Sequence, residues 1–235
     1  MDFVNEKIYL LMQVNDSVFP IGGFSHSYGL ETYILKNLVS NADNTYEYVS
    51  TNLKTAFTYS ELLVASKAYD YAKAGDIAKL VELDKKMHAM KLPQETRDAS
   101  LKLGSRFVKT ILSTPEIKFE SNVFAEYNKT VAENKVVPNH SVAYGVFCAA
   151  IDVDKRTALS FYLYASTSAM VTNSVKTIPL SQTDGQQILY RCSKIYDEIV
   201  ENAMTLDESY IGLSMPGFDV RCMQHETLYS RLYMS

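Results

Sequence analysis

Apolar positions recur every three or four residues along nearly the whole chain, which is the period of an α-helix. The clearest stripe predicts one long helix that ends near Gly75. Its members are Tyr46, Val49, Leu53, Phe57, Val64, Ala68 and Tyr71. A second helix is expected to begin at Pro93 and to stop before Pro115, because proline is tolerated in the first turn of a helix and excluded from its interior. The pattern of the chain is therefore helical.

Capping residues divide the remaining sequence into further helices. Asp76, Asn139 and Asp154 each precede a helical stripe, where a side-chain oxygen accepts hydrogen bonds from the first free N–H groups. Ser181 and Asp184 have the spacing of a capping box. The helix they start is expected to carry the stripe Ile188, Cys192, Ile195 and Ile199. With no convincing strand pair, we expect an all-α fold, a single-domain bundle of roughly eight to ten helices over residues 1–235.

Composition and charge narrow the function classes. The chain has 235 residues, 47% of them hydrophobic and 21% charged, which is typical of a globular protein. A net charge of −4 without any Lys/Arg run argues against binding to nucleic acid or to an anionic membrane surface. The longest apolar run, 144–151, is far below the roughly 20 residues that a membrane helix needs. Three widely spaced cysteines indicate free thiols in a reducing compartment, so we expect a cytoplasmic protein.

The first distinctive segment is Asp16–Glu31, D-S-V-F-P-I-G-G-F-S-H-S-Y-G-L-E, which holds three of the nine glycines. Glycine is favoured where the backbone needs a positive φ or a close approach. Gly22 and Gly23 predict a sharp turn, after which Ser25 is expected to cap a helix that runs to about Lys36. Phe19 and Phe24 are too apolar for a solvated loop, so each is expected to pack in the core or to contact another protein.

Two more segments stand out in the second half of the chain. In P-L-S-Q-T-D-G-Q-Q-I-L, which begins at Pro179, Gly185 lies inside the first turn, where it costs about 1 kcal/mol relative to alanine. Such a cost indicates close backbone packing. The second, Asp219–Ser235, reads as a helix rich in Tyr, Arg, Met and His, types that are favoured at protein interfaces. We interpret 216–235 as a C-terminal docking segment with a hinge at 215–217.

Enzyme interpretations are weaker than this docking interpretation. Ser25, His26 and Ser27 suggest a Ser/His hydrolase with Asp16 nearby, but the second glycine of a G-x-S-x-G elbow is missing. We favour Ser25 as a helix cap and His26 as a core or interface residue. Gly22-Gly23 is not a Walker loop, because no Gly-Lys pair occurs in the sequence.

Two further chemistries remain as alternatives at the C-terminal segment. Arg221 and Arg231 are of the right type for an arginine finger that stimulates a partner GTPase, although spacing alone does not support that role. Cys222 and His225 lie three apart on one helix face and are weak candidates for metal ligands. Two ligands do not complete a site, so small apolar packing for Cys222 and a hydrogen-bonded role for His225 are favoured.

The blocks D-S-V-F-P-I-G-G-F-S-H-S-Y-G-L-E, P-L-S-Q-T-D-G-Q and Q-H-E-T-L-Y-S-R-L-Y-M-S, in that order, resemble the UreF family of urease accessory proteins. The resemblance spans essentially the whole chain, although residues 75–135 carry no matched motif. It implies a cytosolic all-α protein, usually a homodimer, whose partners are UreD (also called UreH), the GTPase UreG and the urease apoprotein. In that family GTP hydrolysis by UreG loads nickel into apo-urease, and the UreF member has no established catalytic residue or nucleotide site.

The expected function is therefore that of a non-catalytic adaptor, with nickel and GTP used through the partners and no cofactor bound directly. Three blocks of candidate partner-binding residues follow from the three motifs. They are Phe19, Pro20, Gly22, Gly23, Phe24, Ser25, His26, Gly29 and Glu31; Pro179, Leu180, Gln182, Asp184, Gly185 and Gln186; and Gln224, His225, Glu226, Leu228, Tyr229, Ser230, Arg231, Leu232 and Tyr233. Both stimulation and restraint of UreG remain open.

Overall fold

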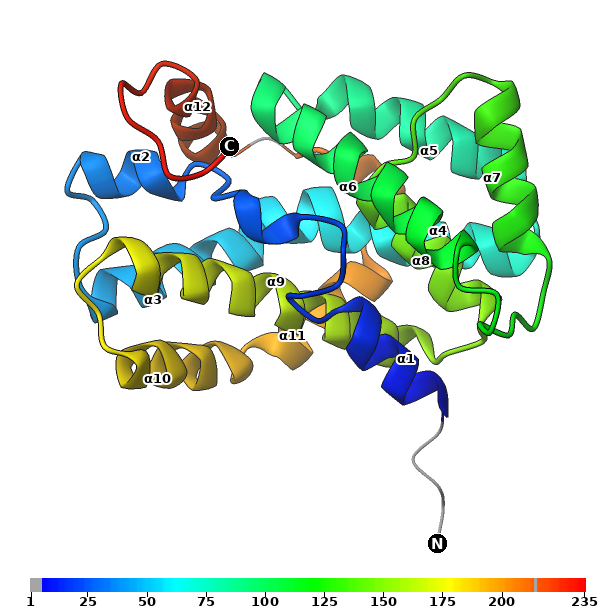
Figure 1. Cartoon of the computed structure of the whole chain (residues 1–235), viewed down its shortest axis with the longest axis horizontal. Coiled ribbons are helices and arrows are strands. Elements are labelled where there is room, and N and C mark those ends of the chain that lie inside the picture. Colours follow the sequence, from blue (N-terminus) through cyan, green and yellow to red (C-terminus); the bar gives the residue numbers. More distant parts are fainter. Residues whose placement is uncertain (1–5, 214) are drawn as a thin grey trace, which may run out of the picture.

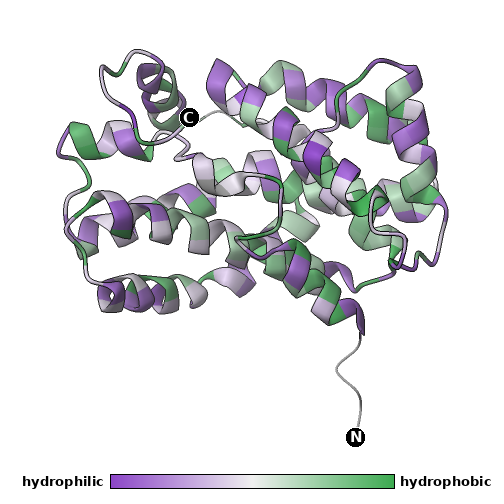
Figure 2. Ribbon diagram, in the orientation of Figure 1, coloured by the Kyte–Doolittle hydropathy of each residue, from purple (hydrophilic) through white to green (hydrophobic). Residues whose placement is uncertain are grey.

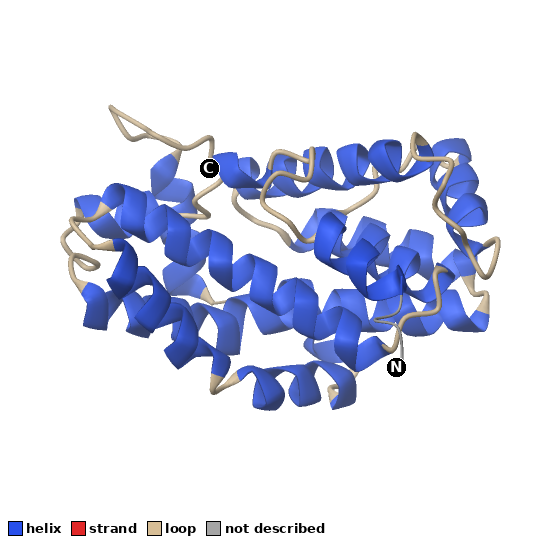
Figure 3. Cartoon of the chain, turned by 60° about the horizontal axis from the view of Figure 1, so that its bottom comes forward, coloured by secondary structure: helices blue, strands red, loops and turns tan. Residues whose placement is uncertain are grey.

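The computed structural model describes residues 6–213 and 215–235, except for the side chain of Phe24. Over these residues the chain is all-α, as expected, and Figure 3 shows helices and loops without strands. The α-helices are α1 (Glu6–Val14), α2 (Leu30–Leu35), α3 (Ala42–Asn52), α4 (Leu63–Ala74), α5 (Ile77–Met90), α6 (Gln94–Leu112), α7 (Val123–Glu133), α8 (His140–Ala150), α9 (Lys155–Thr177), α10 (Gln182–Ser193), α11 (Tyr196–Thr205) and α12 (Pro216–His225). The 3₁₀ turns are η1 (Gly23–Ser25) and η3 (Glu208–Tyr210), and η2 (Leu53–Leu62) is π-helical.

The long helix predicted from the first apolar stripe is confirmed. α3, η2 and α4 form one continuous helix, so the described residues contain eleven separate helices, ten of them seven residues or longer. The run ends at Gly75, which adopts a left-handed conformation with φ 70°. In Figure 1 this helix crosses the middle of the molecule, with α5, α6, α7 and α8 gathered around one end, α10 near the other, and α9 and α11 alongside it. It joins the two halves of a single bundle.

The core lies where α8 packs between α4 and α6. Ten of the eleven residues of α8 are buried, and Figure 2 shows it as mainly apolar, whereas most other helices carry both kinds of residue. Gly145 permits the close approach to α4, because a Cβ there would lie 2.4 Å from the carbonyl oxygen of Ala65. Phe19 is buried and packs against Phe107 at a ring-centroid distance of 5.9 Å, so of its two expected roles Phe19 takes the one in the core.

The predicted caps are confirmed at four helix starts. Asp76, Asn139, Asp154 and Ser181 each accept a backbone hydrogen bond at the first turn of α5, α8, α9 and α10. The single helix expected over the stripe from Ile188 to Ile199 is wrong, because the chain leaves the helix at Lys194–Ile195 and starts α11 at Tyr196. The stripe continues across the break, since Ile199 is buried in α11. Apolar periodicity alone does not reveal a turn that keeps the same face inward.

Candidate functional site

The glycine-rich segment forms a turn in front of α2. Gly22 has φ 85° and is followed by the η1 turn, while Tyr28 and Gly29 are both left-handed, with φ 51° and 85°. A helix starting at Ser25 is therefore a wrong prediction, because two successive left-handed residues cannot continue a right-handed helix. α2 begins at Leu30 instead, and the Ser25 hydroxyl donates to the Gly22 carbonyl at 2.8 Å.

The C-terminal segment folds back onto this turn. α12 packs on α2 and α6, and the remaining residues, 226–235, form a non-helical tail; Figure 1 shows both beside α2. The prediction of one helix over 219–235 is therefore wrong beyond His225. Leu232, Tyr233 and Met234 direct their backbone N–H groups at α2 and the turn rather than at a preceding helical carbonyl. Pro216 is the first residue of α12, while residue 214 lies outside the described residues, so the hinge stays a prediction.

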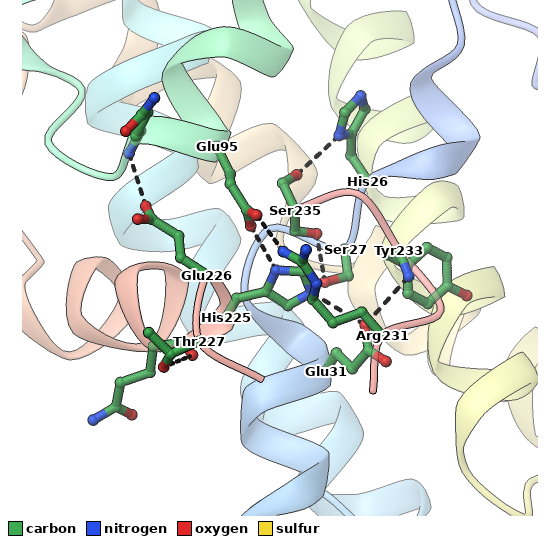
Figure 4. A network of polar contacts seen from close by, with 12 residues as sticks. His26, Ser27, Glu31, Glu95, His225, Glu226, Thr227, Arg231, Tyr233 and Ser235 are labelled. Atoms are coloured by element: carbon green, nitrogen blue, oxygen red, sulfur yellow. Dashed lines mark hydrogen bonds and ion pairs between the residues drawn. The ribbon is translucent and has the colours of Figure 1, made fainter. Parts of the chain in front are cut away.

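His225 is the centre of the junction between these segments. Its ring is fully buried, with Nε2 3.1 Å from Glu31 Oε2 and Nδ1 2.7 Å from Glu95 Oε2. Figure 4 shows the imidazole between the two carboxylates, one from α2 and one from α6. Arg231 pairs with the other oxygen of Glu95. Three helices, α2, α6 and α12, and the tail are thereby joined through one polar cluster around a buried ring.

The Glu31 carboxylate also binds the backbone of the tail. Oε1 accepts the Leu232 N–H at 2.7 Å and Oε2 accepts the Tyr233 N–H at 3.3 Å. On the other side of α12, Glu226 Oε1 accepts the Gln94 N–H at 3.1 Å. Glu31 is thus buried and acts within the chain, rather than lying on an exposed surface as a simple contact residue would.

The last residue binds the turn itself. The carbonyl oxygen of Ser235 accepts hydrogen bonds from the Ser27 and Tyr28 N–H groups at 2.6 and 3.0 Å, and from the Ser27 hydroxyl at 2.7 Å. His26 Nδ1 lies 2.9 Å from Ser235 Oγ (Figure 4). Burial, with Lys102 and Arg106 nearby, lowers the pKa of His26, so the ring is neutral at physiological pH.

This geometry does not assemble the serine nucleophile that the sequence suggested. The Ser25 and Ser27 hydroxyls donate to the carbonyl oxygens of Gly22 and Ser235, and the His26 ring faces Ser235. A base that activates a serine must lie within hydrogen-bond distance of its hydroxyl. The segment instead forms a turn to which the end of the C-terminal tail is hydrogen-bonded.

The C-terminal candidates for metal and phosphate chemistry are engaged in the fold. Both ring nitrogens of His225 face glutamates, and burial raises the pKa of the Cys222 thiol to about 11. The part of the chain that the structure describes holds no group of three or more His, Cys, Asp or Glu side chains placed to bind a metal ion. Arg221 donates to Gln224 of the same helix at 2.8 Å, and Arg231 pairs with Glu95 of α6, so each has a partner within the chain.

Exposure separates the C-terminal candidates into anchors and free side chains. His225 is buried, while several apolar side chains of the same segment lie in solvent. We call these the tail face: Val220 (44% exposed), Met223 (40%), Tyr229 (106%), Leu232 (76%) and Met234 (58%). Large apolar side chains exposed together on one segment are typical of a protein contact. Of the candidates in the glycine-rich segment, Pro20 is exposed, Phe19, His26, Gly29 and Glu31 are buried, and Gly22, Gly23 and Ser25 are partly buried.

The segment 179–187 lies apart from this junction. It starts α10, which packs on α9 and α3, and Figure 1 places α10 and α12 at opposite edges of the molecule. The capping box is formed, with the Ser181 N–H donating to Asp184 Oδ2 at 2.8 Å and the Asp184 N–H to Ser181 Oγ at 3.1 Å. A Cβ on Gly185 would lie 2.8 Å from Val175 Cγ2, so the close packing expected there is present. Pro179, Gln182 and Gln186 are exposed, and Leu180 is partly buried.

Residues that complete the junction were missed by the sequence analysis. Glu95 comes from the start of α6, and Asn173 of α9 donates to the His26 carbonyl at 2.9 Å. Arg106 lies over Gly22 and donates to the Ile21 carbonyl at 3.2 Å. No local pattern marks these residues, because each lies far in sequence from the group it contacts.

Comparisons with known proteins find relatives over nearly the whole chain. The family model described as UreF matches residues 39–193. The urease accessory protein UreF of Actinobacillus pleuropneumoniae serotype 3 is 35% identical over 96% of this chain and 97% of its own length. Those of Haemophilus influenzae strain PittGG and Bacillus sp. strain TB-90 are 36% and 33% identical, over 96% and 97% of this chain and 94% and 99% of theirs. None of the described helices combines the length and the apolar character needed to cross a bilayer.

Proposed function

Because the chain belongs to the UreF family of urease accessory proteins, we propose that it is a non-catalytic cytoplasmic adaptor that bridges UreD (UreH) and the GTPase UreG. In this proposal the GTP-dependent delivery of nickel to the urease apoprotein takes place on the partners. The adaptor binds neither nickel nor GTP as a cofactor of its own. It works as a homodimer that holds the other proteins together.

The observation that supports this proposal is that the C-terminal segment is fixed to the rest of the chain by some of its groups and exposes others. Its backbone and its charged groups are fixed to α2, α6 and the glycine-rich turn, while the tail face points its apolar side chains into solvent. Such an arrangement lowers the entropy lost on binding, because the backbone that carries the exposed side chains is already fixed. We propose that the tail face binds UreD.

UreG is proposed to bind elsewhere, on a surface that includes the exposed residues of segment 179–187. That segment lies at the opposite edge of the molecule from the tail face, so both partners fit on the chain at once. Binding of UreD then stabilises the docked form of the C-terminal segment and favours UreG, because two binding events are coupled when both require the same state.

The first experiment removes residues 224–235 and follows complex formation with UreD and UreG by size-exclusion chromatography. Loss of the ternary complex with nearly unchanged far-UV circular dichroism is expected. Because this deletion also removes His225, whose loss leaves Glu31 and Glu95 unpaired, a second variant keeps all anchors: Tyr229→Ala with Leu232→Ala.

The double variant is expected to weaken UreD binding at least about thirtyfold, as loss of a central interface pair does, while thermal stability stays unchanged. The matched control is Tyr190→Ala with Leu112→Ala, which removes side chains of the same types that are 65% and 47% exposed elsewhere. Equal UreD affinity for both double variants contradicts the docking role of the tail face.

A further inference from the structure

A groove runs along the exposed side of α6, away from the buried stripe that packs on α8. It consists of two depressions of about 370 and 380 Å³ that share Ser105. Residues 98–113 of α6 line one side, which at 1.5 Å per residue gives a length of roughly 22 Å. The tail face and segment 179–187 include none of the residues that line this α6 groove.

The opposite wall is the segment that joins α7 to α8, where Val137 and Pro138 line the groove. Gly104 lets this segment lie close to α6, because a Cβ at Gly104 would be 2.1 Å from the Pro138 carbonyl oxygen. The next residue, Asn139, is buried and donates its N–H to Asp84 of α5 at 2.7 Å. The wall is therefore fixed by the fold, which lowers the entropy that a ligand loses on binding.

A row of positive charges follows the α6 groove. Lys102, Arg106 and Lys109 are spaced at i, i+4 and i+7, so they share one side of the helix, and all three are exposed. Neither Lys102 nor Lys109 has a carboxylate partner within the part of the chain that the structure describes. The lining holds these three cations and one carboxylate, Asp98. We call Lys102, Arg106 and Lys109 the cationic row.

Apolar side chains line the groove beside the cationic row. Leu101, Val108 and Pro138 contribute to the lining, and Leu112 and Val137 are 47% and 45% exposed. Burial of exposed apolar surface favours association. A nucleic-acid backbone presents phosphates and sugars, which leave such side chains without an apolar partner. The combination of charge and apolar surface therefore fits a protein segment better than a nucleic acid.

We propose that the α6 groove binds an acidic amphipathic segment of another protein, with its carboxylates along the cationic row and its apolar side chains against Leu112 and Val137. A helix with glutamates at i, i+4 and i+7 has the same spacing as the row. The net charge of −4 of the whole chain disfavours a large anionic surface, whereas a short segment experiences mainly the local positive charges. The inference does not rest on the proposed function, which assigns UreD to the tail face.

Binding of a designed peptide to the full chain tests the α6 groove. The probe is a helical peptide of about 16 residues, enough to span the groove, with glutamates at i, i+4 and i+7 and leucines on the adjacent face. The comparison peptide has lysine in place of each glutamate. Fluorescence anisotropy at low ionic strength is expected to show at least about tenfold tighter binding of the acidic peptide. Amide NMR shifts caused by that peptide are expected at residues 98–113 and 137.

Charge reversal separates this site from a general attraction. Lys102→Glu with Lys109→Glu is expected to invert the preference, so that the variant binds the lysine peptide more tightly. The matched control is Lys85→Glu with Lys176→Glu, which alters two exposed lysines of α5 and α9 and gives the same net charge. The control is expected to keep the preference for the acidic peptide. Loss of folding weakens both peptides and cannot invert their order.

Three outcomes would overturn the proposal. They are equal affinity of the unaltered chain for the two peptides, inversion by the control as well as by the groove variant, and binding of phosphatidylserine vesicles without binding of the acidic peptide. The last would assign the cationic row to a membrane surface. Failure of Tyr229→Ala with Leu232→Ala to weaken UreD binding overturns the proposed function instead and leaves the peptide result in place.

Discussion

Replacing Gly29 by alanine tests how tightly α12 is held against the start of α2. Gly29 has φ 85°, and a Cβ there would lie 2.9 Å from Cys222 Sγ and 3.1 Å from Cys222 N. Cys222 belongs to the middle of α12, so its backbone moves only if the whole helix moves. The substitution therefore forces α12 away from α2.

The cost has two parts. Alanine in a left-handed conformation costs about 1 kcal/mol. Moving α12 by roughly half an ångström takes the 3.1 Å contact between His225 and Glu31 beyond hydrogen-bond distance, and a hydrogen bond to a charged group is worth about 2 kcal/mol. The total of about 3 kcal/mol corresponds to a loss of roughly 6–12 °C in Tm for a protein of this size.

Gly75→Ala is the matched control. Gly75 has φ 70°, but a Cβ there meets nothing within 4 Å, so only the backbone cost of about 1 kcal/mol is expected. Urea unfolding measures both variants, and hydrogen exchange at residues 232–234 reports the tail. Gly29→Ala is expected to lose more stability and to expose the tail, whereas Gly75→Ala leaves the tail protected. Equal losses and equal tail protection in the two variants would refute the packing argument.

Two further predictions concern the core. Gly145→Ala is expected to cost on the order of 3 kcal/mol in thermal unfolding, because a Cβ lies 2.4 Å from the Ala65 carbonyl oxygen and α8 cannot stay against α4; an unchanged Tm contradicts this. Burial raises the pKa of Asp84 to about 7 against the hydrogen bonds from Tyr127 and Asn139. The folded state then holds a proton that the unfolded state releases near pH 4, so stability falls as the pH rises from about 4 to 7. Asp84→Asn is expected to remove about 2–4 kcal/mol of the stability difference between pH 5 and 8 in urea unfolding; an identical difference argues against a protonated Asp84.

Local patterns were sufficient for the helices that pack by an apolar stripe and start at a capping side chain. The long helix to Gly75 and the caps at Asp76, Asn139, Asp154 and Ser181 depend on neighbours within a few residues, which the sequence displays directly. The predictions failed where distant groups decide the backbone. Tyr28 adopts a positive φ although it is not a glycine, so its sequence gives no sign of this conformation. Beside it, the Ser235 carbonyl oxygen accepts hydrogen bonds from two backbone N–H groups of the turn.

The sequence singled out several residues of the junction by type, but it did not predict their geometry. The sequence placed Glu31 and His225 among partner-binding residues, whereas both are buried and hold each other across 194 residues of chain. Glu95 has no motif around it, because its role arises only from the packing of α12 on α6. Burial divides the residues of the motifs into buried anchors and exposed side chains, and that division depends on a tertiary arrangement that periodicity does not contain.

The docked tail is held mainly by hydrogen bonds, and this limits its stability. Tyr229, Leu232 and Met234 contribute little burial, so the free energy of opening the tail is expected to lie below that of global unfolding. If the docked tail is the form that UreD binds, then UreD must slow hydrogen exchange at residues 232–234, because a ligand that binds only the docked form shifts the equilibrium toward it. Exchange of these amides in the chain with and without UreD measures the effect, and equal rates would contradict binding to the docked form.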